Sequence, residues 1–252
     1  MRPVRRGASP NVSDFADYRD AFPELVSRLG PYCSYCERRI ATQLAVEHIQ
    51  PKGLAQYAAL EGKWENFLLA CVNCNSTKGD KDVVPTDVLL PDRDNTFIAY
   101  RYAQDGTVSV NSSLPPPVAA QADATLALVG LDKRIAQAVD ANGKLVAIDR
   151  VSQRMEAWLL ALTSKEELDA EPQSAGLRRQ IIRTAVGNGF FSIWMAVFAA
   201  DADMRNRLID AFSKKGNAVI TGTRGSGSFD AATTAPIQPA PNPDLLAHGG
   251  KL

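Results

Sequence analysis

LLACVNCNSTKGDK, residues 68–81, decides the fold, because it joins an apolar run to a closely spaced pair of cysteines. The run begins at residue 66 (NFLLAC) and has the length and composition of a short buried strand. It leads directly into Cys71 and Cys74, which form a C-x2-C pair. One such pair is weak evidence, since the same spacing occurs at redox sites and by coincidence. Its meaning depends on the other cysteines of the chain.

A second C-x2-C pair, Cys33 and Cys36, lies in YCSYCERRI, and the chain has no further cysteine. Two pairs with none left over fit a tetrahedral zinc ion held by four thiolates at about 2.3 Å. Disulfides and buried free thiols are the alternatives, and a reducing compartment disfavours disulfides. A site closed by four thiolates has no open position for a substrate. We therefore predict a structural zinc ion bound by Cys33, Cys36, Cys71 and Cys74.

The segment between the two pairs is unusually long for a zinc ribbon. Ordinary four-cysteine ribbons separate their pairs by about 15–20 residues, whereas 34 residues, 37 to 70, lie between them here. This segment contains AVEHIQPKG, residues 45–53, with one of the two histidines of the chain. Imidazole titrates near physiological pH, so His48 beside Glu47 is a candidate general base. A histidine at the end of a strand is also often a buried structural residue, which is the simpler interpretation of His48 alone.

The order of these motifs resembles the HNH endonucleases, a family with the ββα-metal fold. The resembling part runs from Tyr32 to about Asp82 and reads C-x2-C, then VEHIQPK, then W-x-N-x-LLAC-x2-CN-x2-KGDK. The resemblance implies a nuclease that hydrolyses phosphodiester bonds with the help of a divalent ion.

The resemblance also implies roles for single residues. His48 corresponds to the general base, and Asn66 to the residue that restrains the loop carrying the base. Glu47 and Asn75 correspond to ligands of the catalytic ion, although Asp is commoner at the first position and His at the second. Both offer an oxygen donor, which favours Mg²⁺ or Mn²⁺ over zinc at this site. The candidates for phosphate contacts are Lys52, Lys78 and Lys81.

Residues outside this region predict mainly helices. Residues 13–30 are expected to form two short helices separated at Pro23. Residues 96–111 are expected to form a hairpin that turns at Asp105-Gly106. SLPPPV, residues 113–118, is expected to be a linker.

The region from about 119 to 215 has a helical pattern. Gly130 is expected to end one helix and Asp132 to start the next, which Asn142-Gly143 interrupts. FFSIWMAVFAA, residues 190–200, has Ser192 as its single polar residue, so a helix there must be covered on nearly every side. Either the interior of this chain or a docked partner provides that cover; we favour the interior.

These patterns together predict an α+β fold. We expect an HNH nuclease domain with N-terminal helices over residues 1–112 and a helical domain for partner docking or regulation over 119–221. Residues 222–252 are rich in Gly, Ala, Ser, Thr and Pro, which predicts a disordered tail.

Charge and hydropathy narrow the function further. The chain has 28 Lys and Arg against 28 Asp and Glu, which excludes a wholly cationic, unspecific nucleic-acid-binding surface. We therefore expect weak intrinsic affinity for DNA and dependence on a partner. The most apolar run is too short to span a membrane, and no signal peptide is visible, so we expect a cytoplasmic protein.

A narrower resemblance involves four stretches: YCSYCERRI, AVEHIQPK, LLACVNCNSTKGD and GFFSIWMAVFAAD. They are similar to the PtuB family, the HNH nuclease subunits of Septu anti-phage systems. This implies a DNA-cutting effector that works beside an ABC-type ATPase of the PtuA kind. Two alternatives remain open: a zinc module that binds nucleic acid or protein without catalysis, and a restriction- or homing-type nuclease that acts alone.

Overall fold

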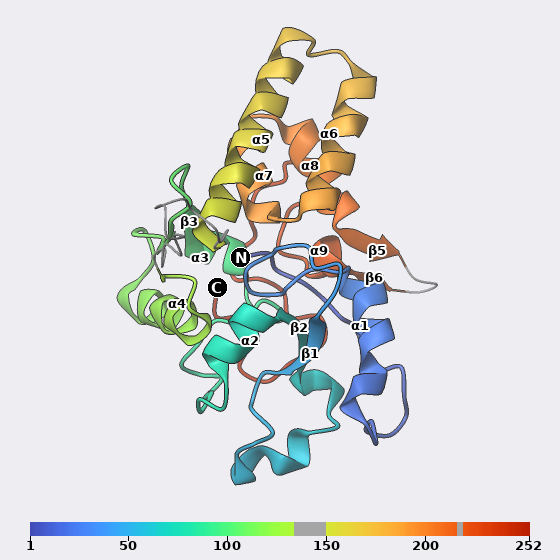
Figure 1. Cartoon of the computed structure of the whole chain (residues 1–252), viewed down its shortest axis with the longest axis vertical. Coiled ribbons are helices and arrows are strands. Elements are labelled where there is room, and N and C mark those ends of the chain that lie inside the picture. Colours follow the sequence, from blue (N-terminus) through green and yellow to red (C-terminus); the bar gives the residue numbers. More distant parts are fainter. Residues whose placement is uncertain (134–149, 216–218) are drawn as a thin grey trace, which may run out of the picture.

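The computed structural model describes residues 1–133, 150–215 and 219–252, and the predicted α+β class is confirmed. Within these ranges, three small antiparallel sheets of two strands each lie among short and long helices (Figure 1). The first half of the chain contains η1 (Tyr18–Ala21), α1 (Phe22–Leu29), β1 (Leu44–His48), η2 (Ala55–Leu60), η3 (Trp64–Asn66), β2 (Phe67–Cys71), α2 (Val72–Lys78), α3 (Thr96–Ala99), β3 (Tyr100–Tyr102), β4 (Val108–Val110) and α4 (Pro116–Val129). The second half contains α5 (Arg150–Ala170), α6 (Ala175–Asn188), α7 (Phe191–Val197), α8 (Ala202–Ala211), β5 (Ser213–Lys215), β6 (Ile220–Thr221) and α9 (Gly222–Gly225).

The predicted strands around the cysteine and histidine motifs are present and pair with each other. β1 and β2 run antiparallel, with His48 opposite Phe67 and Leu44 opposite Cys71. Every residue of β2 is buried, as its continuous apolar sequence indicates. α2 begins immediately after β2, so two strands and one helix follow the order of the ββα unit that the resemblance implies.

The N-terminal helices differ in detail from the prediction. Two short helices, η1 and α1, follow one another as predicted, but they meet at Ala21 and Phe22. Pro23 lies in the first turn of α1, where proline is tolerated because its missing N–H would have no helical partner. The preceding 3₁₀ helix η1 is capped by Asp17, whose side chain accepts from the Arg19 backbone N–H. The hairpin predicted over residues 96–111 is present as β3 and β4, with one turn of helix, α3, before it.

The predicted linker at residues 113–118 is wrong for its second half, because α4 starts at Pro116 with Pro115 as its cap. Prolines at a helix start resemble a linker in sequence. α4 ends at Gly130, as predicted, in the left-handed conformation. Its buried Leu126 and Val129 belong to the same hydrophobic core as β1 and β2. The core of the HNH region therefore extends past 119, where we expected the helical domain to start. The helix predicted to start at Asp132, with its break at Asn142-Gly143, lies outside the described residues.

A second hydrophobic core is built by α5, α6, α7 and α8, which group at one end of the molecule in Figure 1. α7 lies within it: Trp194 is fully buried, Phe198 is 1% exposed, and their rings stack at 6.4 Å between centroids. Phe191 contacts the ring of Phe212 edge to face. The apolar stretch 190–200 is therefore covered by this chain, and the interior-core interpretation is confirmed.

Replacing Trp194 by alanine is expected to lower the free energy of unfolding by about 3–5 kcal/mol, the usual cost of removing a large buried aromatic side chain. Chemical denaturation of the purified chain measures this. Leu159→Ala on α5, where the side chain is 62% exposed, is the control and is expected to change stability little. Equal effects of the two substitutions would contradict the assignment of Trp194 to the core.

The prediction of a disordered tail over residues 222–252 is wrong. Leu252 is fully buried, and Phe229 is 5% exposed within the second core. Asn95 donates from Nδ2 to the carbonyls of Ser228 and Ile237, both at 2.9 Å, and its own N–H binds the Leu252 carbonyl. The composition of residues 222–252, rich in small residues and proline, gives this segment too few apolar side chains to form a core of its own. This segment instead inserts a few apolar side chains into cores that earlier residues form.

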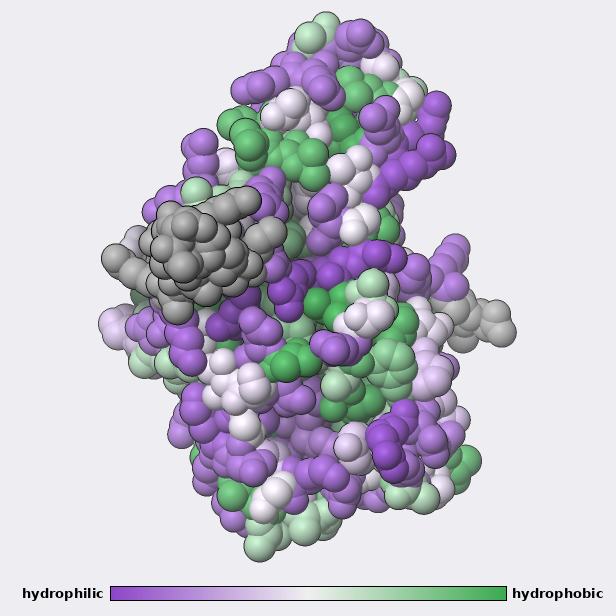
Figure 2. Space-filling model, in the orientation of Figure 1, coloured by the Kyte–Doolittle hydropathy of each residue, from purple (hydrophilic) through white to green (hydrophobic). Residues whose placement is uncertain are grey.

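The surface is mixed in character. Polar residues prevail on the face shown in Figure 2, with apolar patches between them. One apolar patch lies over α5, which exposes Met155, Leu159 and Leu160. None of the helices in the described ranges is both long enough and apolar enough to cross a membrane.

Candidate functional site

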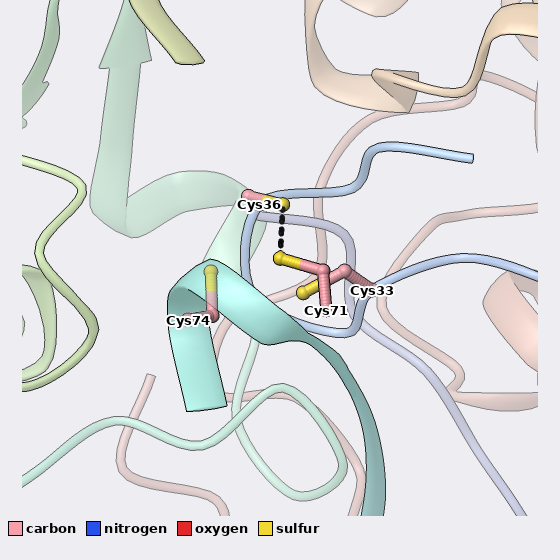
Figure 3. A group of neighbouring side chains, drawn as sticks. All are labelled: Cys33, Cys36, Cys71 and Cys74. Carbon is pink, nitrogen blue, oxygen red and sulfur yellow. Dashed lines mark hydrogen bonds between the residues drawn. The ribbon is translucent and has the colours of Figure 1, made fainter. Parts of the chain in front are cut away.

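The four cysteines come together as predicted. Cys33 and Cys36 lie on the loop after α1, Cys71 ends β2 and Cys74 lies on α2 (Figure 3). All are buried without disulfides, and their sulfur atoms lie within 4.8 Å of one another. Cys36 Sγ and Cys71 Sγ are 3.7 Å apart, close to the roughly 3.8 Å between sulfurs in tetrahedral zinc with 2.3 Å bonds. The tetrad therefore fits a structural zinc ion.

The surroundings of the tetrad fit a cation that keeps the sulfurs deprotonated. Hydrogen bonding to Cys33 is the largest cause that raises the pKa of Cys36 and the pKa of Cys74 above the ordinary value. Hydrogen bonding to Cys33 lowers the pKa of Cys71, so without metal the four sulfurs hold protons unequally. A dication shared by all four supplies the attraction needed for four thiolates to lie together.

Sequence analysis missed one residue of this site, Arg150 at the start of α5. Its Nη1 donates to Cys74 Sγ at 3.4 Å, and its guanidinium also donates to the carbonyls of Val129 and Gly130. A zinc ion with four thiolates has a net charge of about −2, which a guanidinium partly compensates. No sequence signal identifies Arg150, because it stands 76 positions after Cys74 and in no motif.

His48 lies at the end of β1 and is 8% exposed. Its Nε2 is 2.9 Å from the Glu61 carbonyl oxygen. Because a carbonyl only accepts hydrogen bonds, Nε2 carries the hydrogen, and Nδ1 is the unprotonated nitrogen. The rings of Tyr18 and Phe67 pack edge to face against the imidazole, at 4.7 and 5.2 Å between centroids. Burial lowers the pKa of His48 below its ordinary value of 6.5, so the ring is neutral at pH 7.

Asn66 binds the backbone two residues after His48. Its Oδ1 accepts from the Gln50 N–H at 2.8 Å, and its Nδ2 donates to the Gln50 carbonyl at 2.9 Å. Nδ2 also lies 3.3 Å from the Leu60 carbonyl. Asn66 thus holds both polar backbone groups of Gln50, and its role in restraining the loop remains a prediction.

Glu47 is buried and contacts two side chains. Its Oε2 accepts from the Tyr35 hydroxyl at 2.8 Å, and its Oε1 lies 2.8 Å from Lys78 Nζ in an ion pair. Burial raises the pKa of Tyr35 well above its usual range, so the phenol keeps its proton and donates. Lys78 is 2% exposed, and its Nζ also donates to the His48 carbonyl at 2.7 Å. The ammonium of Lys78 therefore lies inside the protein in this structure, and its contact with a phosphate remains a prediction.

Asn75 lies on α2, one helical turn before Lys78, and is partly exposed. Residues three positions apart leave a helix on the same side. Lys78 reaches Glu47 on β1, so the side of α2 that contains Asn75 is turned toward β1. The role of Asn75 as a metal ligand remains a prediction.

The other two lysines are exposed. Lys52 pairs with Glu61 at 2.6 Å and lies over the ring of Tyr18, so it stands beside the residues that contact His48. Lys81 is near the Leu128 carbonyl, at 3.5 Å. Both positions leave an ammonium accessible to a phosphate, and their contacts with nucleic acid remain predictions.

Comparison with protein families matches residues 33–81 to the model described as HNH endonuclease. The match begins at the first cysteine and ends at Lys81, so it includes both cysteine pairs and every residue with a predicted catalytic role. It covers 49 of the 252 residues. The chain matches no curated protein. The family match supports a nuclease whose HNH domain is the part built on β1, β2 and α2.

Proposed function

We propose that this protein is a metal-dependent endonuclease that hydrolyses DNA phosphodiester bonds at His48. The observation that carries the proposal is the tautomer of His48. Its Nε2 hydrogen is bound by the Glu61 carbonyl, and its pKa is lowered by burial, so a neutral ring keeps Nδ1 available to accept a proton. A water molecule that attacks phosphorus must lose a proton, and a neutral imidazole is suited to take it.

The neighbouring residues orient this base and offer ligands for the ion. Asn66 fixes the backbone at Gln50 and thereby the strand end that carries His48. Glu47 and Asn75 would hold Mg²⁺ or Mn²⁺, since carboxylate and amide oxygens are hard donors. Glu47 Oε1 is buried, and its neighbour in the metal-free protein is the Lys78 ammonium. When bound, the ion neutralises charge on the phosphate and on the leaving oxygen.

The cellular role is proposed from the motif resemblance and the charge balance. A chain with equal numbers of acidic and basic residues binds DNA weakly without help. An ABC-type ATPase as partner in an anti-phage complex supplies both targeting and a signal for activation. A cytoplasmic location belongs to this proposal, because thiolate ligands persist where thiols stay reduced.

The experiment is a cleavage assay on plasmid DNA and on RNA of the same sequence, with Mg²⁺, Mn²⁺ or no added divalent ion, with and without an ABC-type ATPase of the PtuA kind. The proposal expects divalent-dependent DNA cleavage that the ATPase stimulates. Full activity of the chain alone would favour a stand-alone nuclease. Binding without cleavage under every condition would favour the non-catalytic zinc module.

The pH dependence of cleavage is a further prediction. His48 acts as a base only when neutral, and burial disfavours its protonated form. Activity is therefore expected to persist as the pH falls to 6.5 and to decline only below it, with the midpoint of the acid limb under the ordinary histidine value of 6.5. The measurement is kcat/KM against pH at fixed ionic strength. A midpoint at or above 6.5 would contradict the assignment.

A further inference from the structure

The carboxylate of Glu47 is bound on two sides, by Tyr35 from the loop after α1 and by Lys78 from α2. Tyr35 stands between the zinc-binding Cys33 and Cys36, and its hydroxyl donates to Oε2 at 2.8 Å. Lys78 stands at the end of α2, and its ammonium lies 2.8 Å from Oε1. All three side chains are almost inaccessible to solvent. A buried carboxylate is strongly unfavourable unless it is paired, and Tyr35 and Lys78 together provide the pairing.

The two oxygens of Glu47 are not held equally. Oε2 accepts a hydrogen bond from the phenol, whereas Oε1 has the ammonium within ion-pair distance but accepts no hydrogen bond. The ammonium instead donates to the His48 carbonyl oxygen. Oε1 is therefore a buried anionic oxygen that faces a singly charged cation, next to the strand end that carries the proposed base. A divalent ion attracts such an oxygen more strongly than an ammonium does.

We propose that Lys78 is a placeholder for the divalent ion: its ammonium neutralises Glu47 in the metal-free protein, and the ion displaces it from Oε1. Tyr35 keeps Oε2 fixed in both states, so a residue of the zinc-binding loop positions the carboxylate of the second metal site. The inference rests on the proposed function for the identity of the ion. It gives Lys78 and Tyr35 the roles of positioning residues.

The test measures Mn²⁺ affinity by electron paramagnetic resonance on the full-length zinc-loaded protein. Lys78→Met removes the competitor, so the Kd for Mn²⁺ is expected to fall about tenfold. Without added Mn²⁺ the melting temperature of the variant is expected to be lower than that of the wild type, and it is expected to rise more when Mn²⁺ is added. Tyr35→Phe is expected to weaken Mn²⁺ binding about 10–100-fold, the usual effect of losing a partner of a metal ligand. Its zinc content is expected to stay unchanged.

Lys165→Met, at a partly exposed position of α5, is the matched control and is expected to leave Mn²⁺ affinity unchanged. If Lys78→Met does not fold in the absence of Mn²⁺, Lys78→Gln keeps a donor for the His48 carbonyl without the charge, and the same gain in affinity is expected. Unchanged or weaker Mn²⁺ binding by these variants would overturn the placeholder role. Weaker DNA binding with unchanged Mn²⁺ binding would overturn it in favour of a phosphate contact.

The two proposals fail in different ways. A wild-type protein that binds Mn²⁺ and cleaves DNA, together with a Lys78→Met variant of unaltered Mn²⁺ affinity, overturns the placeholder role alone. A wild-type protein that neither binds Mn²⁺ nor cleaves DNA with its partner overturns the proposed function, and the placeholder role with it.

Discussion

Replacing Cys71 by serine is expected to unfold the HNH domain and to release its zinc. Cys71 joins β2 to α2, and its sulfur lies 3.7 Å from that of Cys36, so one ligand connects three segments of the chain. Structural zinc supplies about 10–16 kcal/mol of apparent binding free energy in zinc-finger peptides. Whole domains are stable by only about 5–15 kcal/mol. Loss of the ion therefore removes as much free energy as the fold possesses.

Elemental analysis and circular dichroism of the purified variants measure this effect. The wild type is expected to contain about one zinc per chain, and Cys33→Ser is expected to behave like Cys71→Ser. Val72→Ser is the control, since Val72 follows Cys71 directly but is 54% exposed. A folded wild-type protein with less than about half a zinc per chain would refute the structural role of the ion.

Replacing His48 by alanine is expected to lower the rate of DNA cleavage by about 10²–10⁴-fold, the usual contribution of a general base. His48→Gln is the sharper variant. Its amide can still donate to the Glu61 carbonyl, but it provides no base, so the same loss of activity is expected with less disturbance of the packing against Tyr18 and Phe67. Single-turnover cleavage assays measure the rate, and a DNA-binding assay is expected to show unchanged affinity.

The chain provides its own control for this experiment. His248 is the only other histidine and is exposed, so His248→Ala is expected to leave the cleavage rate unchanged. Full activity of His48→Gln would show that the imidazole is structural. In that case the rings of Tyr18 and Phe67 around His48 would be the reason for its position, and the base would have to be sought elsewhere.

Sequence patterns predicted the parts of this protein whose partners lie within one short region. The strand at β2, its pairing with β1 and the zinc tetrad follow from apolar runs and cysteine spacing between residues 33 and 74. The environment of Glu47 was not predictable in this way. Lys78 lies four residues after Cys74, in a stretch whose sequence is typical of a solvent-exposed helix end. Only the packing of α2 on β1 buries its side chain.

The two larger errors have a common physical origin. The rule that a segment rich in small residues stays disordered assumes that the segment must bury its own surface. Residues 222–252 instead complete surfaces made by the rest of the chain, as the buried Leu252 shows. The prolines before α4 likewise start a helix that packs on the HNH region, although prolines in sequence indicate an interruption.

The C-terminal segment, residues 222–252, also affects the order in which the parts of the protein can fold. Arg5 pairs with Gly222, and the Leu252 carbonyl accepts from Asn95, so contacts of very long sequence separation close both ends of the chain. Residues 244–247 line a cavity together with Gln50 and Asn66, beside the loop that carries His48. Such high contact order slows folding, because long loops must close before their contacts form. On the ribosome, residues 33–81 emerge long before their covering segment. The surroundings of His48 are therefore expected to be complete only after synthesis of the last residues described here, so the HNH region acquires its final structure late.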